Sequence, residues 1–537
     1  MDTPGGAPAP DPTPPAVPAG EPSDAEPATP SGDPGRPARE TRGQLRGSSV
    51  LLVGRLLSVG VNLVTQVLIA RYLTTTDFGA FAYAMSMVTL VGGLIGLGFD
   101  RAISRFLPIY DEGRDYPKFF GTLLLVVGVV IGLGGTAVLL VIGLQGWLVG
   151  RIASDPLAVA LLAVMIALAP IEALDGVLTD LFAVFRSTRT IFVRRYILGP
   201  GLRLAVVAVL IATANDVDFL AAGYVIAGAM GIVLYGTMLP RMLRGAGILQ
   251  HLSLRSIRIP LREVASYTFP LLTLDIVLLF MSSLDALIVG SVHGSAEVAE
   301  LRVVESTARM NSLVFTTFSI MFVPAAARFF ARGDRASMRD LYWRTAAWMA
   351  VLSFPIFALT FSLAEPVTVA LFEERYRSSG IILAILSLAR FIDAALGANG
   401  QTIRIFGGIK ETVLINIATA IIHLVLAVIL IPPFQALGAA VAILLTYIIF
   451  NILKQYALRR VAGVPMFDTA YLPIYGSIVG AAVVIGIAEV TINPPLWAAL
   501  GLAGVGSLVV LALGRRSLRI GETFPELLRF PGARFFR

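Results

Sequence analysis

Residues 81–98 read FAYAMSMVTLVGGLIGLG, and residues 100–113 read DRAISRFLPIYDEG. The first stretch is apolar and carries no charge, whereas the second begins a basic connection. An apolar helix of about 20 residues crosses the roughly 30 Å hydrocarbon core of a bilayer. Lys and Arg are enriched in the loops that remain in the cytoplasm. The two stretches together predict a transmembrane helix that ends at the cytoplasmic surface.

The same pairing of apolar run and connecting loop repeats along the whole chain. Of the 42 Lys and Arg residues, 33 fall in alternate connections, five in the other connections and four inside the runs. This alternation predicts an all-α integral membrane protein with about 14 helices and both termini in the cytoplasm. The predicted spans are 48–70, 78–100, 119–145, 157–184, 196–214, 219–240, 263–290, 303–324, 345–363, 380–403, 411–431, 435–453, 470–491 and 495–513.

Composition supports this class and excludes others. The chain is 56% hydrophobic and 14% charged, against about 25% charged in soluble domains. Its net charge of +7 is spread over many loops, so we expect no nucleic-acid partner. The chain has no cysteine, and its three histidines lie far apart in the sequence. We therefore expect no metal site and no cofactor.

The longest basic connection follows the sixth span and suggests a boundary between two lobes. A weak similarity between the ends of the second and eighth spans supports this division, because transporters are often built from repeats with the substrate site between them. Twelve prolines in the first forty residues predict a disordered leader. The expected organisation is a tail at 1–44, a six-helix lobe at 45–245, a basic loop at 246–262, a second six-helix lobe at 263–460, a helix pair (13 and 14) at 461–514 and a basic tail at 515–537.

A motif lies where the first span meets the second, in the sequence LIARYLTTTDFG at residues 68–79. It resembles the Arg-x-Leu turn and Asp-Phe-Gly start of the oligosaccharide flippase and polysaccharide exporter family, a branch of the MATE-like superfamily. The topology matches that family over roughly residues 45–515. The matching residues are Arg71, Leu73, Asp77, Phe78 and Gly79, with Asp100 and Arg101 after the second span and Arg105 beyond them.

The resemblance implies two six-helix lobes in a V-shaped arrangement that alternates between inward-open and outward-open states. The implied substrate is a polyprenyl-diphosphate-linked oligosaccharide, moved across the cytoplasmic membrane of a prokaryote for cell-surface polysaccharide biosynthesis. Membrane lipids and other polysaccharide-assembly proteins are the implied partners. The two extra helices at the carboxyl end would flank a groove for the lipid.

Charges inside the spans are candidates for the substrate cavity, because a charge at mid-bilayer costs about 2.5–3.5 kcal/mol. Arg55 lies in the first span, with Asn62 and Gln66 on roughly the same face. A guanidinium in a central cavity can pair with the phosphate oxygens of a lipid diphosphate. The alternative is that Arg55, about one turn inside the span, extends its charged end to the cytoplasmic surface.

Two further spans carry charges of both signs. Glu305 and Arg309 are four residues apart, and Arg390 and Asp393 are three apart. Acids and bases at these spacings form ion pairs on one helix face. Each pair is therefore either neutralised within its own helix or available to the substrate.

Acidic residues in the spans are candidates for coupling to H⁺ or Na⁺. Asp275 lies near the middle of the seventh span, and Glu172 and Asp175 lie deep in the fourth. Burial raises the pKa of a carboxyl and allows it to exchange a cation; the alternative is a hydrogen-bonded contact between helices. Asp285, nearer the outer face, and His423, a lone histidine in the eleventh span, are weaker candidates.

Two other functions compete with the flippase. A cation-coupled multidrug exporter would share the fold, and its cavity would be acidic and aromatic rather than cationic. A membrane polysaccharide polymerase or ligase would need a sizeable external loop with catalytic acids or histidines. The external segments here are short, and no nucleophile–base pair can be identified. We therefore expect a transporter rather than an enzyme.

Overall fold

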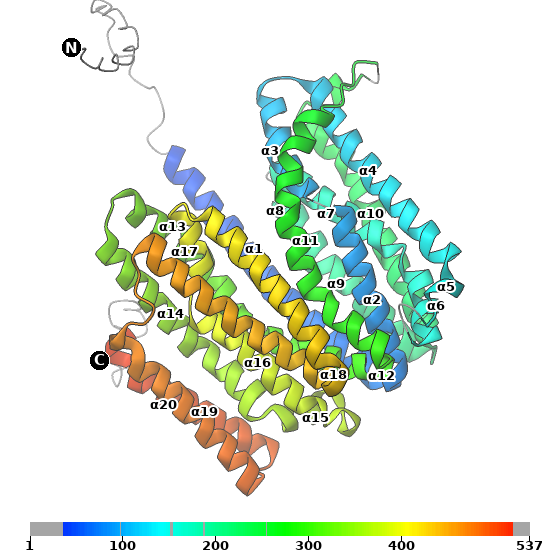
Figure 1. Ribbon diagram of the computed structural model, residues 1–537. Helices are drawn as coiled ribbons and strands as arrows, with labels where there is room; N and C mark the ends of the chain where they lie inside the picture. The colour runs from blue at the N-terminus through cyan, green and yellow to red at the C-terminus, as the bar shows by residue number, and fades with distance from the viewer. Residues whose placement is uncertain (1–35, 97, 151–153, 186–187, 254, 519–537) are drawn as a thin grey trace, which may run out of the picture. The chain divides into compact units, whose positions relative to one another are not determined.

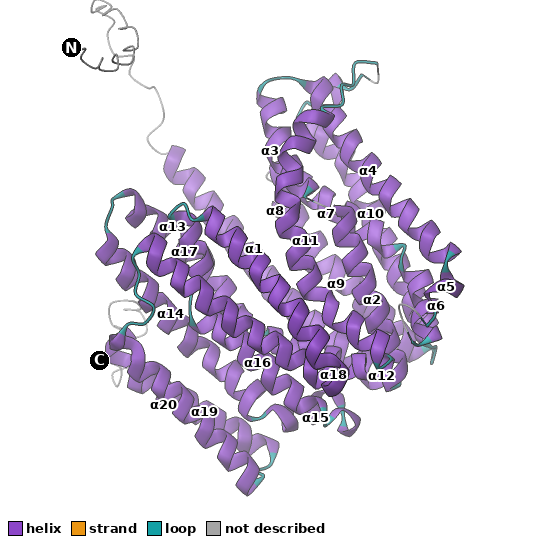
Figure 2. Ribbon diagram, viewed as in Figure 1, coloured by secondary structure: helices purple, strands orange, loops and turns teal. Residues whose placement is uncertain are grey.

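The computed structural model describes residues 36–96, 98–150, 154–185, 188–253 and 255–518. Within these ranges the regular structure is entirely helical (Figures 1 and 2). The chain divides into two compact units, residues 1–49 and 50–537. The fold and the sites described below belong to the second unit.

Helix α1, Arg36–Tyr72, begins earlier than the sequence suggested. Its first nine residues fall in the segment predicted to be disordered, and the structure has them helical. Pro37 occupies the second helical position, where its missing N–H is not needed, and the following residues are mostly ordinary helix formers. The remainder of the predicted leader, residues 1–35, lies outside the described residues, as do 519–537 of the predicted basic tail.

The first half of the second unit consists of apolar helices with acidic caps. Asp115 and Asp216 accept hydrogen bonds from the backbone N–H groups of Lys118 and Phe219 at 3.3 and 3.2 Å. Such caps satisfy N–H groups that have no partner within the helix. The helices are α2 (Thr75–Gly96), α3 (Phe99–Glu112), α4 (Tyr116–Gly143), α5 (Gln145–Leu148), α6 (Pro156–Met165), α7 (Leu168–Val184), α8 (Thr188–Ile191), η1 (Phe192–Leu198), α9 (Gly199–Ala212) and α10 (Val217–Gly245).

The second half continues with helices of the same character. A short turn, η2 (Leu249–His251), precedes the second half. The helices of the second half enclose an aromatic core, in which the rings of Phe357 and Phe391 stack with their centroids 4.1 Å apart. The helices are α11 (Leu261–Val292), α12 (Ser295–Arg309), α13 (Ser312–Ala331), α14 (Arg335–Phe357), η3 (Ala358–Ser362), α15 (Ala364–Phe372), η4 (Glu374–Tyr376), α16 (Ser379–Ala395), α17 (Asn399–Ile405), α18 (Ile409–Ala462), η5 (Thr469–Tyr471), α19 (Leu472–Ile492) and α20 (Leu496–Leu518).

Helix α18 consists of two helical arms joined at a kink, and it contains two of the predicted spans. Its 54 residues would reach about 80 Å if straight, far more than a bilayer core. The chain leaves helical geometry at Gln435, where φ is 56° and ψ is −136°, directly after Pro432 and Pro433. Gly438 permits the sharp turn, because a Cβ there would lie 2.1 Å from the Leu430 carbonyl oxygen.

Eleven helices, or twelve with one bent pair, are long and apolar enough to cross a membrane in the described part of the chain. The predicted count of fourteen is therefore not confirmed. Helix α18 is counted as a single membrane-crossing helix, although the chain turns back on itself at Gln435. The bent pair, α6 and α7, meets at 41° and fills the fourth predicted span. Helix α11 fills the seventh, but most side chains at 269–282 lie outside the described residues.

Helices α2 and α12 join the two halves through a very close contact. A Cβ placed on Gly79 would lie 1.8 Å from the backbone oxygen of Ser295, so only glycine fits there. Helix α12 also packs against α16 and α18, whereas α2 packs against α6 and α7. The Gly79 contact therefore joins helices from both halves of the chain.

Candidate substrate cavity

Three cavities that share lining residues lie among the helices of the second unit. The first, of about 730 Å³, lies among α1, α7, α9 and α10. The second, of about 520 Å³, shares Asn62, Arg203 and Tyr224 with it. The third, of about 180 Å³, shares Arg302, Glu305 and Arg309 with the second. The shared residues link helices from the two predicted lobes.

In the first cavity two of the acidic residues are already paired with arginines. Arg194 Nη2 lies 2.6 Å from Asp175 Oδ1, and Arg203 Nη2 lies 3.0 Å from Glu172 Oε1. Both carboxylates were candidates for cation coupling. With a guanidinium in contact, each already has its counter-charge, so the structure does not support Glu172 and Asp175 as a free cation site.

The wall between the second and third cavities carries more positive than negative charge. Glu305 lies between Arg302 and Arg309 and accepts hydrogen bonds from both. The predicted pairing of Glu305 with Arg309 is present, with Nη2 and Oε1 2.5 Å apart. One carboxylate cannot neutralise two guanidinium groups. Arg203, which also lines the second cavity, is already paired with Glu172, so two arginines face one glutamate at this wall.

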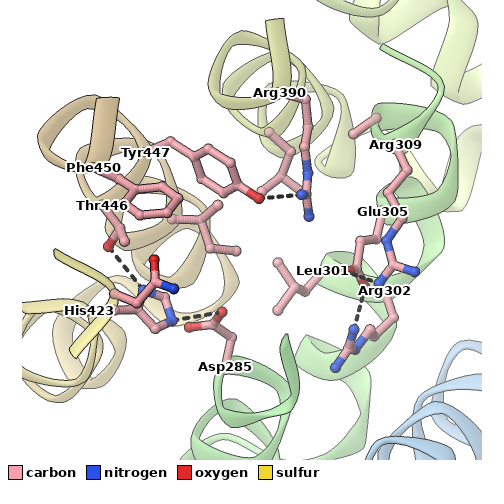
Figure 3. A pocket seen from close by; sticks show the side chains of 14 residues that line it. Asp285, Leu301, Arg302, Glu305, Arg309, Arg390, His423, Thr446, Tyr447 and Phe450 are labelled. Carbon is pink, nitrogen blue, oxygen red and sulfur yellow. Dashed lines mark hydrogen bonds and ion pairs between the residues drawn. The ribbon is translucent and has the colours of Figure 1, made fainter. Parts of the chain in front are cut away.

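The third cavity adds a further arginine (Figure 3). Arg390 donates a hydrogen bond to the hydroxyl of Tyr447. The expected pairing of Arg390 with Asp393 is not found among the described contacts. Asp393 lies instead 3.6 Å from Lys454 Nζ and accepts a hydrogen bond from Asn451 at 3.2 Å. Arg390 faces the cavity with no carboxylate partner in the described residues.

The three candidates on α1 have different environments. Asn62 is exposed and lines the first two cavities. Gln66 is engaged: its Nε2 donates to the carbonyl of Arg302 at 2.7 Å, and its Oε1 accepts from Ser306. Arg55 is exposed and does not line these cavities. It lies seven residues before Asn62, or about 10 Å along the helix.

Two arginines join α1 to the α15–η4 segment at the end of α1, in an arrangement that we call the reciprocal clasp. Arg71 donates to the carbonyls of Ala370 and Leu371, the latter at 2.8 Å. Arg375 donates in return to the carbonyls of Ala70 and Leu73, both at 2.8 Å. Each arginine thus satisfies carbonyls at the carboxyl end of the other helix, which have no partners within it.

The other motif residues support the same junction. Thr74 and Asp77 form a reciprocal cap at the start of α2, with the Asp77 N–H 3.1 Å from Thr74 Oγ1. Phe78 packs edge-on against Tyr376 with ring centroids 6.3 Å apart. Beside it, hydrogen bonds from Arg377 keep the pKa of the Glu374 carboxyl below its usual value. The motif therefore forms one end of the cavity system.

Two of the predicted residues cannot be assessed. The side chains of Asp100 and Asp275 lie outside the described residues, although their backbones belong to α3 and α11. Arg101 is half-buried in α3, away from the residues that line the three cavities. Asp275 as a coupling residue remains a prediction.

Comparison with known families agrees with this geometry. The model of a family described as polysaccharide biosynthesis protein matches residues 44–330, more than half of the chain. The chain belongs to this family. No curated protein matches the chain at a comparable level of significance.

Solved structures give the fold of this polysaccharide biosynthesis family member. The lipid II flippase MurJ, in an inward closed conformation, is 16% identical with a TM-score of 0.67, covering 90% of this chain and 100% of MurJ. An inward-facing multidrug resistance MATE transporter of the MOP superfamily is 13% identical with a TM-score of 0.57, covering 76% and 95%. A MOP superfamily transporter from Pyrococcus furiosus is 15% identical with a TM-score of 0.52, covering 78% and 95%. The predicted all-helical, MATE-like membrane fold is confirmed.

Three cavity residues of this family member were missed or set aside by sequence reasoning. Arg203 lies inside the fifth predicted span, Arg194 just before it and Arg302 just before the eighth, and none of them is among the predicted site residues. A signal for Arg302 existed, because it lies three residues before Glu305. Arg194 pairs with an acid on α7, 19 residues earlier in the chain, and spacing within one helix cannot reveal such a contact.

Proposed function

We propose that this protein is a flippase that moves a polyprenyl-diphosphate-linked oligosaccharide across the cytoplasmic membrane by alternating access. It would act as a transporter and not as an enzyme. The observation that carries the proposal is the surplus of arginine over carboxylate in a cavity shared by both halves of the chain. The family description supports polysaccharide biosynthesis as the setting.

The chemistry of the cavity suits a diphosphate. Arg309 shares the Glu305 carboxylate with Arg302, so N–H groups of Arg309 remain for another anion. The Arg309 side chain is 55% exposed, which makes those donors accessible. Guanidinium groups bind phosphate oxygens through paired, charge-assisted hydrogen bonds. The exposed amide of Asn62 supplies a neutral donor and acceptor for a sugar.

The lipid chain would need an apolar surface that continues from the cavity system. Two cavities between α14–η3 and α20 share Leu359 and Leu500, with volumes of about 520 and 280 Å³. The second of them extends to Leu63 on α1 and Thr307 on α12. Their linings are almost entirely apolar. They suit a polyprenyl tail, as the predicted groove beside the last two helices requires.

Alternating access would require the reciprocal clasp to open. In the structure, Arg71 and Arg375 close the junction of α1 with the α15–η4 segment. Topology from the basic loops assigns that end to the outer face of a prokaryotic membrane and both termini to the cytoplasm. On this assignment the clasp is an outer gate, and its opening would release the sugar outside.

A multidrug exporter with this fold is the competing function. A cavity for cationic drugs would need carboxylates to face the ligand. Three carboxylates that line the first two cavities form ion pairs in the described structure, and each of them is paired with an arginine. They belong to Glu172, Asp175 and Glu305. A cationic drug would therefore meet guanidinium groups, so we favour the anionic substrate.

A binding measurement tests the anionic-substrate proposal. Native mass spectrometry would compare capture of undecaprenyl diphosphate with capture of undecaprenol by the detergent-solubilised protein. We expect preference for the diphosphate and at least a tenfold loss of that preference in Arg309→Gln. Arg332→Gln is the matched control, because Arg332 is equally exposed but lies at the end of α13 outside the cavities. Equal capture of both lipids by the unaltered protein would refute the proposal.

A further inference from the structure

A buried histidine and a buried carboxylate face each other in the third cavity (Figure 3). His423 on α18 is 2% exposed and Asp285 on α11 is 5% exposed. His423 Nε2 lies 3.3 Å from Asp285 Oδ2. The other ring nitrogen, Nδ1, lies 3.0 Å from the hydroxyl of Thr446. The pair therefore joins α11 to α18 inside the bundle.

Counting hydrogens fixes the tautomer of His423. The Thr446 hydroxyl has a single hydrogen, which it donates to the carbonyl of Ala442 at 2.7 Å. Towards His423 it can only accept, so Nδ1 must carry a hydrogen. His423 Nε2 makes no hydrogen bond in the described structure, and in a neutral imidazole it would be an unprotonated nitrogen 3.3 Å from Asp285 Oδ2. Two acceptors would face each other at 3.3 Å in a buried site, which is unfavourable.

We propose that His423 Nε2 and Asp285 Oδ2 together bind one proton, and that this proton is the coupling ion of the transporter. Binding forms the Nε2–H bond with a proton taken from water, and release returns that proton to water. The cavity of about 180 Å³ has room for water molecules, each of which takes up roughly 30 Å³ in the liquid. The role in coupling rests on the proposed transport function, whereas the site itself does not.

A proton fits this site better than a metal ion. Na⁺ prefers several oxygen ligands, whereas one face of Asp285 is occupied by a ring nitrogen. The other oxygen, Oδ1, is buried and has no hydrogen-bond partner in the described structure. No group of three or more His, Asp or Glu residues that could hold a metal was found among the described residues.

The charges around the pair connect it to the substrate cavity. The other charged or titratable groups that line the third cavity are Arg302, Glu305 and Arg309 on α12, Arg390 on α16 and Tyr447 on α18. The three α12 residues also line the second cavity. A proton on the pair therefore adds positive charge next to the arginines proposed to bind a diphosphate.

Helix α11 gives the pair a mechanical connection to the first half of the chain. A Cβ on Gly290 of α11 would lie 2.3 Å from the Tyr83 ring on α2, so these helices are in close contact. The same helix carries Asp285 and is held to α18 through His423. Loss of the proton would leave two acceptors opposed and would favour separation of α11 from α18. We expect that movement to change the distance between the two halves.

The test uses spin labels on a chain that has no native cysteine. Cysteines replace Glu112 at the end of α3 and Arg332 at the end of α13, both exposed. Pulsed electron–electron resonance would record their separation in bilayers at pH 5.5 and pH 8.5 without substrate. We expect two different distance distributions in the labelled parent. We expect one pH-independent distribution in His423→Gln and in Asp285→Asn.

The control is His293→Gln, because His293 caps α11 and lies 3.1 Å from the Ile431 carbonyl, away from the third cavity. Its labelled form should respond to pH as the parent does. The proposal is wrong if the parent does not respond to pH, if His423→Gln responds as the parent does, or if exchanging Na⁺ for K⁺ at fixed pH produces the shift. Since no substrate is present, none of these results depends on the proposed flippase function.

A spectroscopic measurement tests the tautomer directly. The chain has three histidines, so ¹⁵N-histidine labelling gives few signals, which the His→Gln variants assign. We expect Nδ1 of His423 to carry hydrogen throughout and Nε2 to be the nitrogen that responds to pH. A neutral His423 with hydrogen on Nε2 would overturn the assignment.

Discussion

At the scale of single residues, the cavity depends on an unequal ratio of charges. Glu305 contacts Arg302 and Arg309 together, and its carboxylate is the group that limits the positive charge of the shared wall. Removing one partner from a buried ion pair usually destabilises a protein, because the other charge loses its partner. Here Arg309 is 55% exposed, so solvent screens part of that effect.

The first prediction concerns Glu305→Gln, which keeps the shape of the side chain and removes its charge. We expect affinity for inorganic diphosphate to rise several-fold, because the exposed Arg309 guanidinium loses its carboxylate partner and becomes available to the anion. We also expect a modest fall in the thermal unfolding midpoint. Isothermal titration calorimetry and thermal unfolding in detergent would measure the two effects. Unchanged or weaker binding of diphosphate would contradict the assignment of this wall to an anion.

Residue-level prediction from the sequence succeeded where both partners lie on one helix. The Glu305–Arg309 pair follows from its spacing and is present in the structure. It failed for Arg390 and Asp393, because Lys454 on α18 lies close to Asp393. Arg55 looked distinctive because its helix holds no acidic partner, yet its side chain is exposed and away from the cavities. Contacts between helices decided both cases.

At the scale of helices, glycine determines how closely the two halves approach. Gly79 brings α2 against α12, where a Cβ would lie 1.8 Å from a backbone oxygen of Ser295. A backbone atom cannot move aside as the end of a flexible side chain can. The resemblance to a family singled out Gly79, but the partner helix could be found only from the structure.

The second prediction compares two glycine substitutions. Gly79→Ala should lower the thermal unfolding midpoint, by an amount equivalent to roughly 1–3 kcal/mol for an overpacked contact. Gly128→Ala on α4 is the control, because a Cβ there meets nothing within 4 Å. That control should leave the midpoint unchanged or raise it, since alanine favours helix by up to about 1 kcal/mol. Equal effects of the two substitutions would show that the α2–α12 contact is not limiting.

The helices themselves were largely predictable, because apolar runs of membrane length are a strong signal. The break in α18 at Gln435 coincides with the first residue of the predicted span 435–453. The start of α1 at Arg36 was not predicted, because the disordered leader was inferred from its proline content and was taken to run to residue 44. The α12–α13 break near Met310 and Asn311 was missed too, because it lies inside the predicted span 303–324.

At the scale of the whole molecule, the account requires the cavity to open alternately at its two ends. The reciprocal clasp holds one end closed through five carbonyl groups at the ends of α1 and α15. Hydrogen bonds from charged donors contribute about 1.5–3 kcal/mol each. Loss of one arginine is therefore enough to shift an equilibrium between two states of similar free energy.

The third prediction is that Arg375→Ala opens the clasped end. Thr89→Cys places a single thiol in the second cavity of a chain without native cysteine. A membrane-impermeant maleimide applied from the clasped side should label this thiol about tenfold faster when Arg375→Ala is also present. Arg377→Ala is the control, because Arg377 pairs with Glu365 and Glu374 on its own segment. Equal labelling rates in both variants would exclude the clasp as a gate.

The central claim is tested most directly by transport in vesicles of purified protein. A fluorescent, polyprenyl-diphosphate-linked sugar would be placed in proteoliposomes, and its exposure to an external glycosidase would be followed over time. We predict protein-dependent translocation of the diphosphate-linked sugar, little translocation of the same sugar on a neutral lipid, and at least a tenfold slower rate in Arg309→Gln. Translocation that ignores the diphosphate, or that is unchanged in Arg309→Gln, would contradict the account.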